Sequence, residues 1–312
     1  MQLVLFFPGQ GTQRPGMLRM LGSDIDRSNE IFEAASQWAG KDIKELCLSG
    51  TEQELKQTEN TQFAVTAMNL CYLRILQDQG IEPNIVLGHS LGQYSALFAA
   101  GVVSLDQLFS IIYKRVVCMQ KVTVDGALCT VLGLELPQVE SICKMLDPTG
   151  ENLSVALHNT KTQVVVGGTA DYITKAEAAF QNAKALRIVH VRVSKPFHTP
   201  LMRTMEEPFS AFIDSLTFSA AKCPLILNCK GEEASNIEDI RDDIKMQSTH
   251  MVRWYDSLLC LSRIAGQSDV YAECGVGKTL SGLLRSVCPG LPTFQLSQPK
   301  HLQTVIEQCK QL

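Results

Sequence analysis

A serine between two glycines is the first feature of this sequence that could carry out chemistry. Gly88-His89-Ser90-Leu91-Gly92 fits the pattern G-x-S-x-G, with a short apolar run before it and a helical pattern after it. In that context the glycines permit a strained strand-to-helix turn that exposes the serine hydroxyl, and the Leu91 N–H can help to stabilise an oxyanion. The pattern alone also fits a glycine-rich loop whose serine caps a helix. The strand–turn–helix context favours a nucleophilic Ser90.

A serine nucleophile needs a base, and the chain has six histidines. His198 lies in the loop Ser194–His198, just after a strand pattern that ends at Val193, and sites collect at the C-terminal ends of parallel strands. His89 adjoins Ser90 and is expected to point away from it. Of the other four, His158 ends a strand and His190 lies opposite the core face of a strand. His250 lies in a polar loop and His301 in the tail. The residues alone leave the choice open between His198 and the other five.

Arg115 is the most informative charged residue. In the helical pattern Leu105–Lys121 it shares a face with apolar residues at helical spacings, Leu108, Ile111, Ile112 and Met119. A guanidinium on a core-facing stripe stays protonated and must be paired. Its partner is either an Asp or Glu of the protein or a substrate carboxylate held by two hydrogen bonds. Spacing alone favours the structural ion pair.

The composition is that of an ordinary globular protein of one large domain or two modest ones. The 312 residues are 45% hydrophobic and 19% charged, which excludes a disordered chain, collagen and a coiled coil. The net charge of -4 gives no basic surface, so we expect no nucleic-acid partner. The apolar runs are too short for a membrane span, and no basic segment precedes the first of them. We therefore expect no membrane partner and a cytoplasmic protein.

The eleven cysteines are scattered along the chain without any C-x-x-C pair. A disulfide scaffold would be short and rich in cysteine, and a zinc site would cluster its ligands. We therefore expect free thiols in a reducing compartment and no metal site.

Hydrophobic periodicity predicts alternating strands and helices in the first and last parts of the chain. The central segment between them has a different order of elements. Such alternation indicates an α/β fold with a parallel sheet covered by helices. The predicted strands outside the central segment are Leu3–Phe7, Asn84–Leu87, Pro224–Asn228 and Val270–Glu273. The predicted helices there are Asp24–Leu48, Thr61–Gln79, a helix from Gly92 to Ala100, Leu105–Lys121, Pro200–Leu216, Val252–Gly266 and Leu280–Val287.

The central segment, residues 126–193, has its own order of elements. Its predicted members are Ala127–Leu132, Pro137–Met145, Leu153–Leu157, Gln163–Val166, Ala170–Asn182 and Ala185–Val193, in the order β-α-β-β-α-β. That order is typical of a ferredoxin-like fold. We therefore predict a ferredoxin-like subdomain at 126–193, inserted into a catalytic core formed by residues 1–125 and 194–312.

Five motifs together resemble the malonyl-CoA:acyl carrier protein transacylase family, which includes stand-alone acyltransferases that serve modular polyketide synthases in trans. They are Phe7-Pro8-Gly9-Gln10-Gly11, Gly88-His89-Ser90-Leu91-Gly92, Arg115 with Met119, Phe197-His198 and Glu273-Cys274-Gly275-Val276-Gly277. Any one of them would be weak, but five in the family's order and spacing are highly specific. The resemblance implies a hydrolase-like α/β core with an inserted ferredoxin-like subdomain, in agreement with the predicted elements.

The resemblance also implies a role for each matching residue. Ser90 would be the nucleophile and His198 its base, while Arg115 would hold the free carboxylate of a malonyl group. The backbone N–H groups of Gln10 and Leu91 would form the oxyanion hole.

Further positions surround these groups. The backbone carbonyl of Gln247 would orient the histidine in place of an aspartate. Phe197 would crowd a branch at C2 of the acyl group, and Met119 would contact the substrate. Asn159 and Gln163 match part of an N-x-x-x-Q pattern of the subdomain.

Three positions depart from the family pattern without removing a catalytic group. Gln93 stands where the family usually has Glu, Val116 where it has Gly, and Leu157 where Asn is common.

The resemblance implies a ping-pong acyltransferase of polyketide or fatty acid biosynthesis, an S-malonyltransferase. Malonyl-CoA would be the donor and the phosphopantetheine thiol of an acyl carrier protein the acceptor. We expect no cofactor, because a thioester is already activated, and a monomer. The alternatives are an acyl hydrolase that clears stalled chains from carrier proteins and a non-catalytic subunit that docks carrier proteins.

Overall fold

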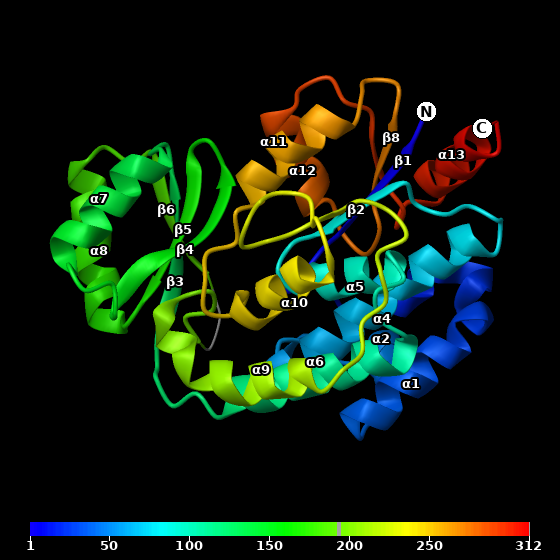
Figure 1. Ribbon diagram of the computed structural model, residues 1–312, viewed down its shortest axis with the longest axis horizontal. Coiled ribbons are helices and arrows are strands. Elements are labelled where there is room, and N and C mark those ends of the chain that lie inside the picture. The colour runs from blue at the N-terminus through cyan, green and yellow to red at the C-terminus, as the bar shows by residue number, and fades with distance from the viewer. Residues whose placement is uncertain (192–194, 312) are drawn as a thin grey trace.

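The computed structural model describes residues 1–191 and 195–311 and contains two sheets (Figure 1). The larger sheet has five strands in the order β7-β2-β1-β8-β9, all paired in parallel. Its strands are β1 (Leu3–Phe7), β2 (Ile85–Gly88), β7 (Leu225–Ile226), β8 (Val270–Glu273) and β9 (Thr293–Gln295). The predicted parallel sheet is therefore confirmed.

Helices cover both faces of this sheet. Those before the small sheet are η1 (Met17–Ser28), α1 (Asn29–Ala39), α2 (Ile43–Ser49), α3 (Glu52–Leu55), α4 (Thr58–Gln77), α5 (Gly92–Ala99) and α6 (Leu105–Gln120). Those after it are η2 (Pro200–Met205), α9 (Glu206–Asp214), α10 (Ile237–Met246), α11 (Trp254–Ile264), α12 (Thr279–Val287) and α13 (Pro299–Cys309). No helix of the described chain is long and apolar enough to cross a membrane.

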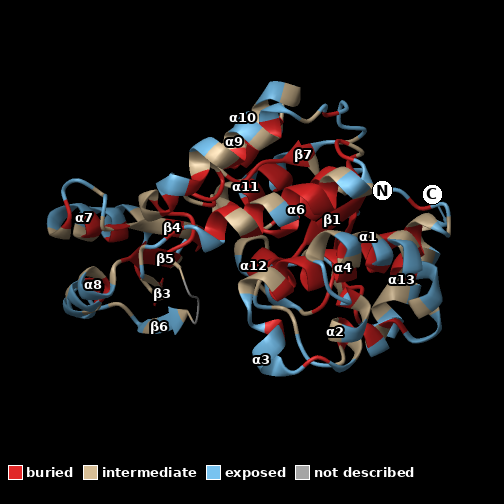
Figure 2. Ribbon diagram, turned by 90° about the horizontal axis from the view of Figure 1, so that it is seen from below, coloured by how far each residue is buried: buried red, intermediate tan, exposed pale blue. Residues whose placement is uncertain are grey.

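The central strand β1 is buried along its whole length and divides the core into two layers (Figure 2). Leu3, Leu5 and Phe7 point into the larger layer, which includes α4 and α6. Val4 and Phe6 point into the smaller layer, formed with α11 and α12. Alternate side chains of a strand face opposite sides, so a strand covered on both faces reads as a continuous apolar run.

The smaller sheet is antiparallel and lies to one side of the larger one (Figure 1). It consists of β3 (Ala127–Leu132), β4 (Leu153–Thr160), β5 (Gln163–Gly168) and β6 (Arg187–Val191), in the order β4-β5-β3-β6. The helices α7 (Leu136–Leu146) and α8 (Ala170–Asn182) share an apolar core with it. This arrangement confirms the ferredoxin-like prediction for the described part of the segment.

Strand β4 of the smaller sheet pairs with Val252, in the segment just before α11. The His158 N–H donates to the Val252 carbonyl at 2.9 Å, and the Val252 N–H donates to the Ala156 carbonyl at 2.9 Å. The division into residues 1–125 with 194–312 and residues 126–193 stays a proposal, and its second boundary lies outside the described residues.

Several predicted elements differ from the structure. The helix predicted over Asp24–Leu48 is the end of η1 followed by α1 and α2. The left-handed conformation of Gly40 (φ 65°) ends α1 and separates it from α2. The helix predicted over Pro200–Leu216 begins as the 3-10 turn η2, and β7 is only two residues long. The end of the strand predicted over Ala185–Val193 lies outside the described residues, as does Ser194 of the predicted loop. The elements α3, α10, β9 and α13 were not predicted.

Candidate active site

Ser90 stands at a sharp turn between β2 and α5. Its backbone is left-handed (φ 51°), and α5 begins at Gly92 without a side-chain cap, so Ser90 is not a capping serine. A Cβ atom at Gly88 would lie 2.1 Å from the carbonyl carbon of Gly92, and one at Gly92 would lie 1.9 Å from the Phe7 carbonyl oxygen. Both glycines are therefore required by close backbone approach, as G-x-S-x-G predicts.

His198 is the histidine that contacts the serine. Its Nε2 lies 2.7 Å from Ser90 Oγ, and its Nδ1 lies 2.7 Å from the backbone carbonyl oxygen of Gln247. A carbonyl only accepts, so Nδ1 carries the proton and Nε2 is left to accept from the serine hydroxyl. The geometry is that of a nucleophile and base whose orienting third group is a backbone carbonyl.

The other five histidines have different partners. Within residues 1–191 and 195–311, none of them hydrogen-bonds to Ser90. His89 turns to Asn159 (2.9 Å) and the Trp254 ring, as expected, and His158 packs on Tyr255. The remaining contacts are His190 with Glu177, His250 with the Met246 carbonyl and His301 with the Gln295 N–H.

The surroundings of His198 hold it in its neutral form. Burial, followed by the positive charge of Arg115, lowers the pKa of His198 to about 3, against the opposing effect of the Gln247 carbonyl. A histidine whose pKa is lowered gives up its proton at a lower pH than usual. His198 therefore stays unprotonated well below neutral pH, as a general base must.

This environment predicts an unusual pH profile. The rate of Ser90 acylation at low substrate should stay flat from about pH 8 down to about pH 5, because His198 remains unprotonated there. In Arg115→Ala the acid limb should move to higher pH, since a repelling charge is removed. Rapid-quench measurement of the acyl-enzyme across this range tests both points. A wild-type midpoint near 6.5, the ordinary histidine pKa, would contradict the expectation.

Two backbone N–H groups flank the serine. Gly9 approaches the turn so closely that a Cβ there would lie 2.6 Å from the His89 carbonyl oxygen and 3.4 Å from Leu91 N. This contact places the loop at Gln10 beside Leu91. Neither the Gln10 N–H nor the Leu91 N–H has a hydrogen-bond acceptor among the described residues. Unpaired N–H groups beside a nucleophile are what an oxyanion hole requires.

Arg115, on α6, is buried at 3% exposure, and its partners among the described residues include no acid. Its Nη1 donates to Gln62 Oε1 at 2.7 Å, and its guanidinium lies 5.4 Å from the centre of the Tyr94 ring. No Asp or Glu of the described chain pairs with it, so the structural ion pair favoured by spacing is wrong. Its Nε is buried and has no acceptor among residues 1–191 and 195–311. Part of its hydrogen-bonding capacity is therefore not used by the described residues, and a carboxylate would supply the acceptors that it lacks.

These groups line one cavity of about 170 Å³. Its wall includes Ser90, His198, Arg115, Met119 and Phe197 from the core, together with Leu128, Leu157 and Val191 from the small sheet. Sites for drug-sized ligands are larger, about 300–1,000 Å³. The cavity therefore fits a short acyl group.

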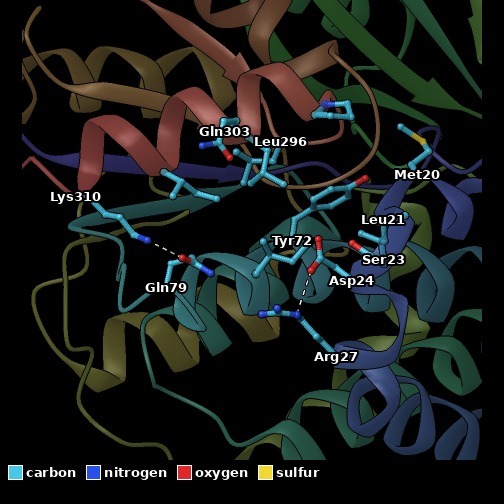
Figure 3. Close-up of a pocket in the computed structure, with 15 residues that line it drawn as sticks. Met20, Leu21, Ser23, Asp24, Arg27, Tyr72, Gln79, Leu296, Gln303 and Lys310 are labelled. Carbon is cyan, nitrogen blue, oxygen red and sulfur yellow. Dashed lines mark hydrogen bonds and ion pairs between the residues drawn. The ribbon is translucent and has the colours of Figure 1, made fainter.

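A second, larger cavity of about 470 Å³ lies between η1, α4 and α13 (Figure 3). An ion pair, Asp24–Arg27, and a hydrogen bond from Lys310 to Gln79 bound it. It shares no lining residue with the Ser90 cavity, and no histidine is in its wall. Ser90 and His198 line the smaller cavity, which is the candidate active site.

Sequence reasoning missed three buried polar residues around this site: Gln62, Asn228 and Asp243. Asn228 ends a predicted strand, which is a position where site residues collect. Asp243 lies at helical spacing with Ile240, Ile244 and Gln247, which would have put it on the buried face of a helix had α10 been predicted.

Cysteines and metal-ligating groups add no further site. All eleven cysteines are free. In the part of the chain that the structure describes, no three His, Cys, Asp or Glu side chains gather as a metal site would need.

Comparison with known proteins places this geometry in a family. Residues 4–265 match the family model described as acyl transferase domain. The chain is 33% identical to the malonyl CoA-acyl carrier protein transacylase of Staphylococcus aureus over 285 residues, 91% of each chain. It is 29% identical to that of Bacillus subtilis, over 99% of this chain and 98% of the relative.

Solved structures agree. A chain from the complex of a type II polyketide synthase acyl-carrier protein with its malonyl-transacylase has a TM-score of 0.93 at 29% identity, covering 99% of this chain and 100% of that one. The malonyl-CoA:acyl carrier protein transacylase of Xanthomonas oryzae pv. oryzae has a TM-score of 0.92 at 32% identity, covering 98% of each chain. The chain belongs to the malonyl-CoA:acyl carrier protein transacylase family of acyl transferase domains.

Proposed function

We propose that this protein moves a malonyl group from malonyl-CoA to the phosphopantetheine thiol of an acyl carrier protein, through an ester on Ser90. The observation that carries the proposal is Arg115, a buried cation in the wall of the cavity that holds Ser90 and His198. No acidic residue of the described chain pairs with it. A buried guanidinium is costly unless it is paired, so the missing anion is expected to arrive with the substrate. Malonyl is a short acyl group that carries such a carboxylate.

The first half-reaction acylates the serine. The carboxylate of malonyl-CoA binds the Nε–Nη2 edge of Arg115, which brings the thioester carbonyl to Ser90. His198 Nε2 takes the Ser90 proton as Oγ attacks the carbonyl carbon. The N–H groups of Gln10 and Leu91 stabilise the oxyanion. The C–S bond then breaks, and the CoA sulfur leaves with the proton held by His198.

The second half-reaction reverses these steps. The phosphopantetheine thiol gives its proton to His198 and attacks the ester carbonyl. The C–O bond breaks, and Ser90 regains its proton from His198. The carbonyl of Gln247 stabilises the imidazolium formed in each half, through its hydrogen bond to Nδ1. Because the thioester is already activated, these steps call for no cofactor.

Two apolar residues in the cavity wall would set the shape of the acyl group. Phe197 is 6% exposed and adjoins the base, so its ring would crowd a branch at C2. Met119 is held by a contact from Gln62 Nε2 to its sulfur at 3.2 Å, and the same Gln62 accepts from Arg115. Gln62 thus contacts Arg115 and also positions Met119 in the cavity wall.

The fate of the ester distinguishes a transferase from a hydrolase. Intact mass should rise by one malonyl group on mixing with malonyl-CoA, and Ser90→Ala should show no rise. The isolated malonyl-enzyme should hydrolyse over minutes or longer but transfer to a cognate holo carrier protein within seconds, since Arg115 holds the ester in one pose.

The same assay can overturn the proposal. Fast release of free acid without carrier protein, together with efficient removal of neutral acyl chains from carrier proteins, would identify an editing hydrolase. No acyl-enzyme with any acyl-CoA or acyl-carrier protein would leave only a docking role.

A further inference from the structure

A fully buried carboxylate lies behind the nucleophile. Asp243, on α10, is 0% exposed and accepts four N–H groups. Its Oδ2 accepts from Gln93 Nε2 at 2.7 Å and from the Asn228 N–H at 3.3 Å. Its Oδ1 accepts from the Cys229 N–H at 2.8 Å and the Lys230 N–H at 3.3 Å. It contacts neither Ser90 nor His198, so the reaction as written above does not use it.

Two amide side chains connect this carboxylate to the serine. Gln93 donates to Asp243 and, through Oε1, accepts from Gln247 Nε2 at 3.0 Å. Gln247 Nε2 also donates to the Ser90 carbonyl oxygen at 2.9 Å. Since the Gln247 backbone carbonyl holds His198, this one residue touches both members of the nucleophile–base pair.

Asn228 completes the support of the turn. The Ser90 N–H donates to Asn228 Oδ1 at 2.8 Å, and Asn228 Nδ2 donates to the Gly88 carbonyl oxygen at 2.7 Å. Both backbone polar groups of Ser90 are thus engaged. The Asn228 side chain accepts from its N–H, and the Gln247 side chain and the Gln93 backbone N–H (3.0 Å) donate to its carbonyl. A serine with positive φ is strained and keeps that conformation only where its surroundings fix it.

The carboxylate sets the direction of every hydrogen bond in this path. Because it can only accept, Gln93 must turn its Nε2 toward Asp243 and its Oε1 toward Gln247. Gln247 must then present Nε2, which is the atom that can donate to the Ser90 carbonyl. Reversing one amide would set two donors or two acceptors against each other, and leaving a buried polar group unpaired is costly.

We propose that Asp243 is a positioning residue that acts through Gln93 and Gln247 to hold the backbone of Ser90 in its reactive conformation. The inference rests on the proposed role of Ser90 as nucleophile.

Exchanging the two side chains provides the test. In Asp243→Asn, an amide must face both Gln93 Nε2 and three backbone N–H groups, so one orientation conflict is unavoidable. In Gln93→Glu, two carboxylates would meet where a hydrogen bond now forms. In the double variant, the amide introduced at position 243 can donate to the carboxylate introduced at position 93 while still accepting from the Cys229 N–H. That new carboxylate can in turn accept from Gln247, so the polarity of the path is restored.

We expect each single variant to lower the rate constant of Ser90 acylation by malonyl-CoA by about 10-fold to 100-fold, the scale of a misplaced reacting group, with KM nearly unchanged. The double variant should regain most of that rate. Asp242→Asn, an exposed neighbour on the same helix, makes the same substitution outside the path and should leave the rate unchanged. Thermal melting of the wild type and the four variants reports folding separately.

Three outcomes would overturn the proposal: wild-type acylation in both single variants, additive losses in the double variant, or a rise in KM alone. If Asp243→Asn does not fold, the double variant decides, because only a polarity requirement would let it fold and react. A double variant that fails to fold or to react counts against the proposal. Each of these results would overturn the positioning role of Asp243. The proposed transferase function would be unaffected as long as Ser90 of the wild type is acylated.

Discussion

Replacing His198 should lower the rate of Ser90 acylation by about 10⁴-fold or more. General-base catalysis by a positioned side chain contributes about 10²–10⁴-fold. The loss here should reach the top of that range, because Ser90 Oγ also loses the 2.7 Å hydrogen bond that orients it. Groups that act as one unit lose most of their effect when either is removed. Pre-steady-state measurement of the malonyl-enzyme reports this step directly.

The choice of substitution matters because His198 has a left-handed backbone (φ 63°). Alanine is disfavoured there, whereas asparagine adopts this region more readily. We expect His198→Asn and His198→Ala to be equally inactive and His198→Asn to be the more stable of the two. Near-wild-type acylation in either would mean that another base serves. His250 could not be that base in the position it occupies, because its side chain lies on the surface and contacts the Met246 carbonyl.

The parts of the fold that were predictable are those with strong local patterns. The strand Leu3–Phe7 and the helix Ala170–Asn182 were predicted with the bounds that the structure shows. A strand buried on both faces gives a continuous apolar run, and the order β-α-β-β-α-β has few compact solutions. The five motifs then added the pairing of Ser90 with His198, which periodicity alone left open.

The part that was not predictable depends on long-range burial. The sequence of α10 holds four acidic residues in ten, so it reads as a solvated helix, yet it places Asp243 in the interior. Likewise, no local pattern shows that Arg115 would meet Gln62 on α4 rather than an acid. Helix spacing gives the face on which a side chain lies, but the partner across the interface comes from the tertiary fold.

The missing acid partner of Arg115 has a direct consequence for specificity. Nη1 is already engaged by Gln62, so a malonyl carboxylate would bind the Nε–Nη2 edge through two parallel hydrogen bonds. Hydrogen bonds to charged groups contribute about 1.5–3 kcal/mol each. Two of them correspond to a factor of about 10²–10⁴ in kcat/KM. An acetyl group has no carboxylate and meets the same cation unpaired.

Arg115→Ala should therefore change the preferred substrate rather than only slow the enzyme. Malonyl-CoA should lose about 10²–10⁴-fold in kcat/KM, while acetyl-CoA should lose little or gain, because the buried charge that opposes a neutral acyl group is gone.

Arg115→Lys is the matched control. Lysine keeps the positive charge but lacks the two parallel N–H donors of a guanidinium. The variant should therefore disfavour acetyl-CoA like the wild type and recover only part of the malonyl-CoA rate. Competition between the two thioesters in one reaction, read by the mass of the acyl-enzyme, measures the preference without correction for the amount of active protein. An equal fall for both substrates would show that Arg115 only supports the fold around Gln62 and Tyr94, and the carboxylate clamp would then have to be sought elsewhere in the cavity wall.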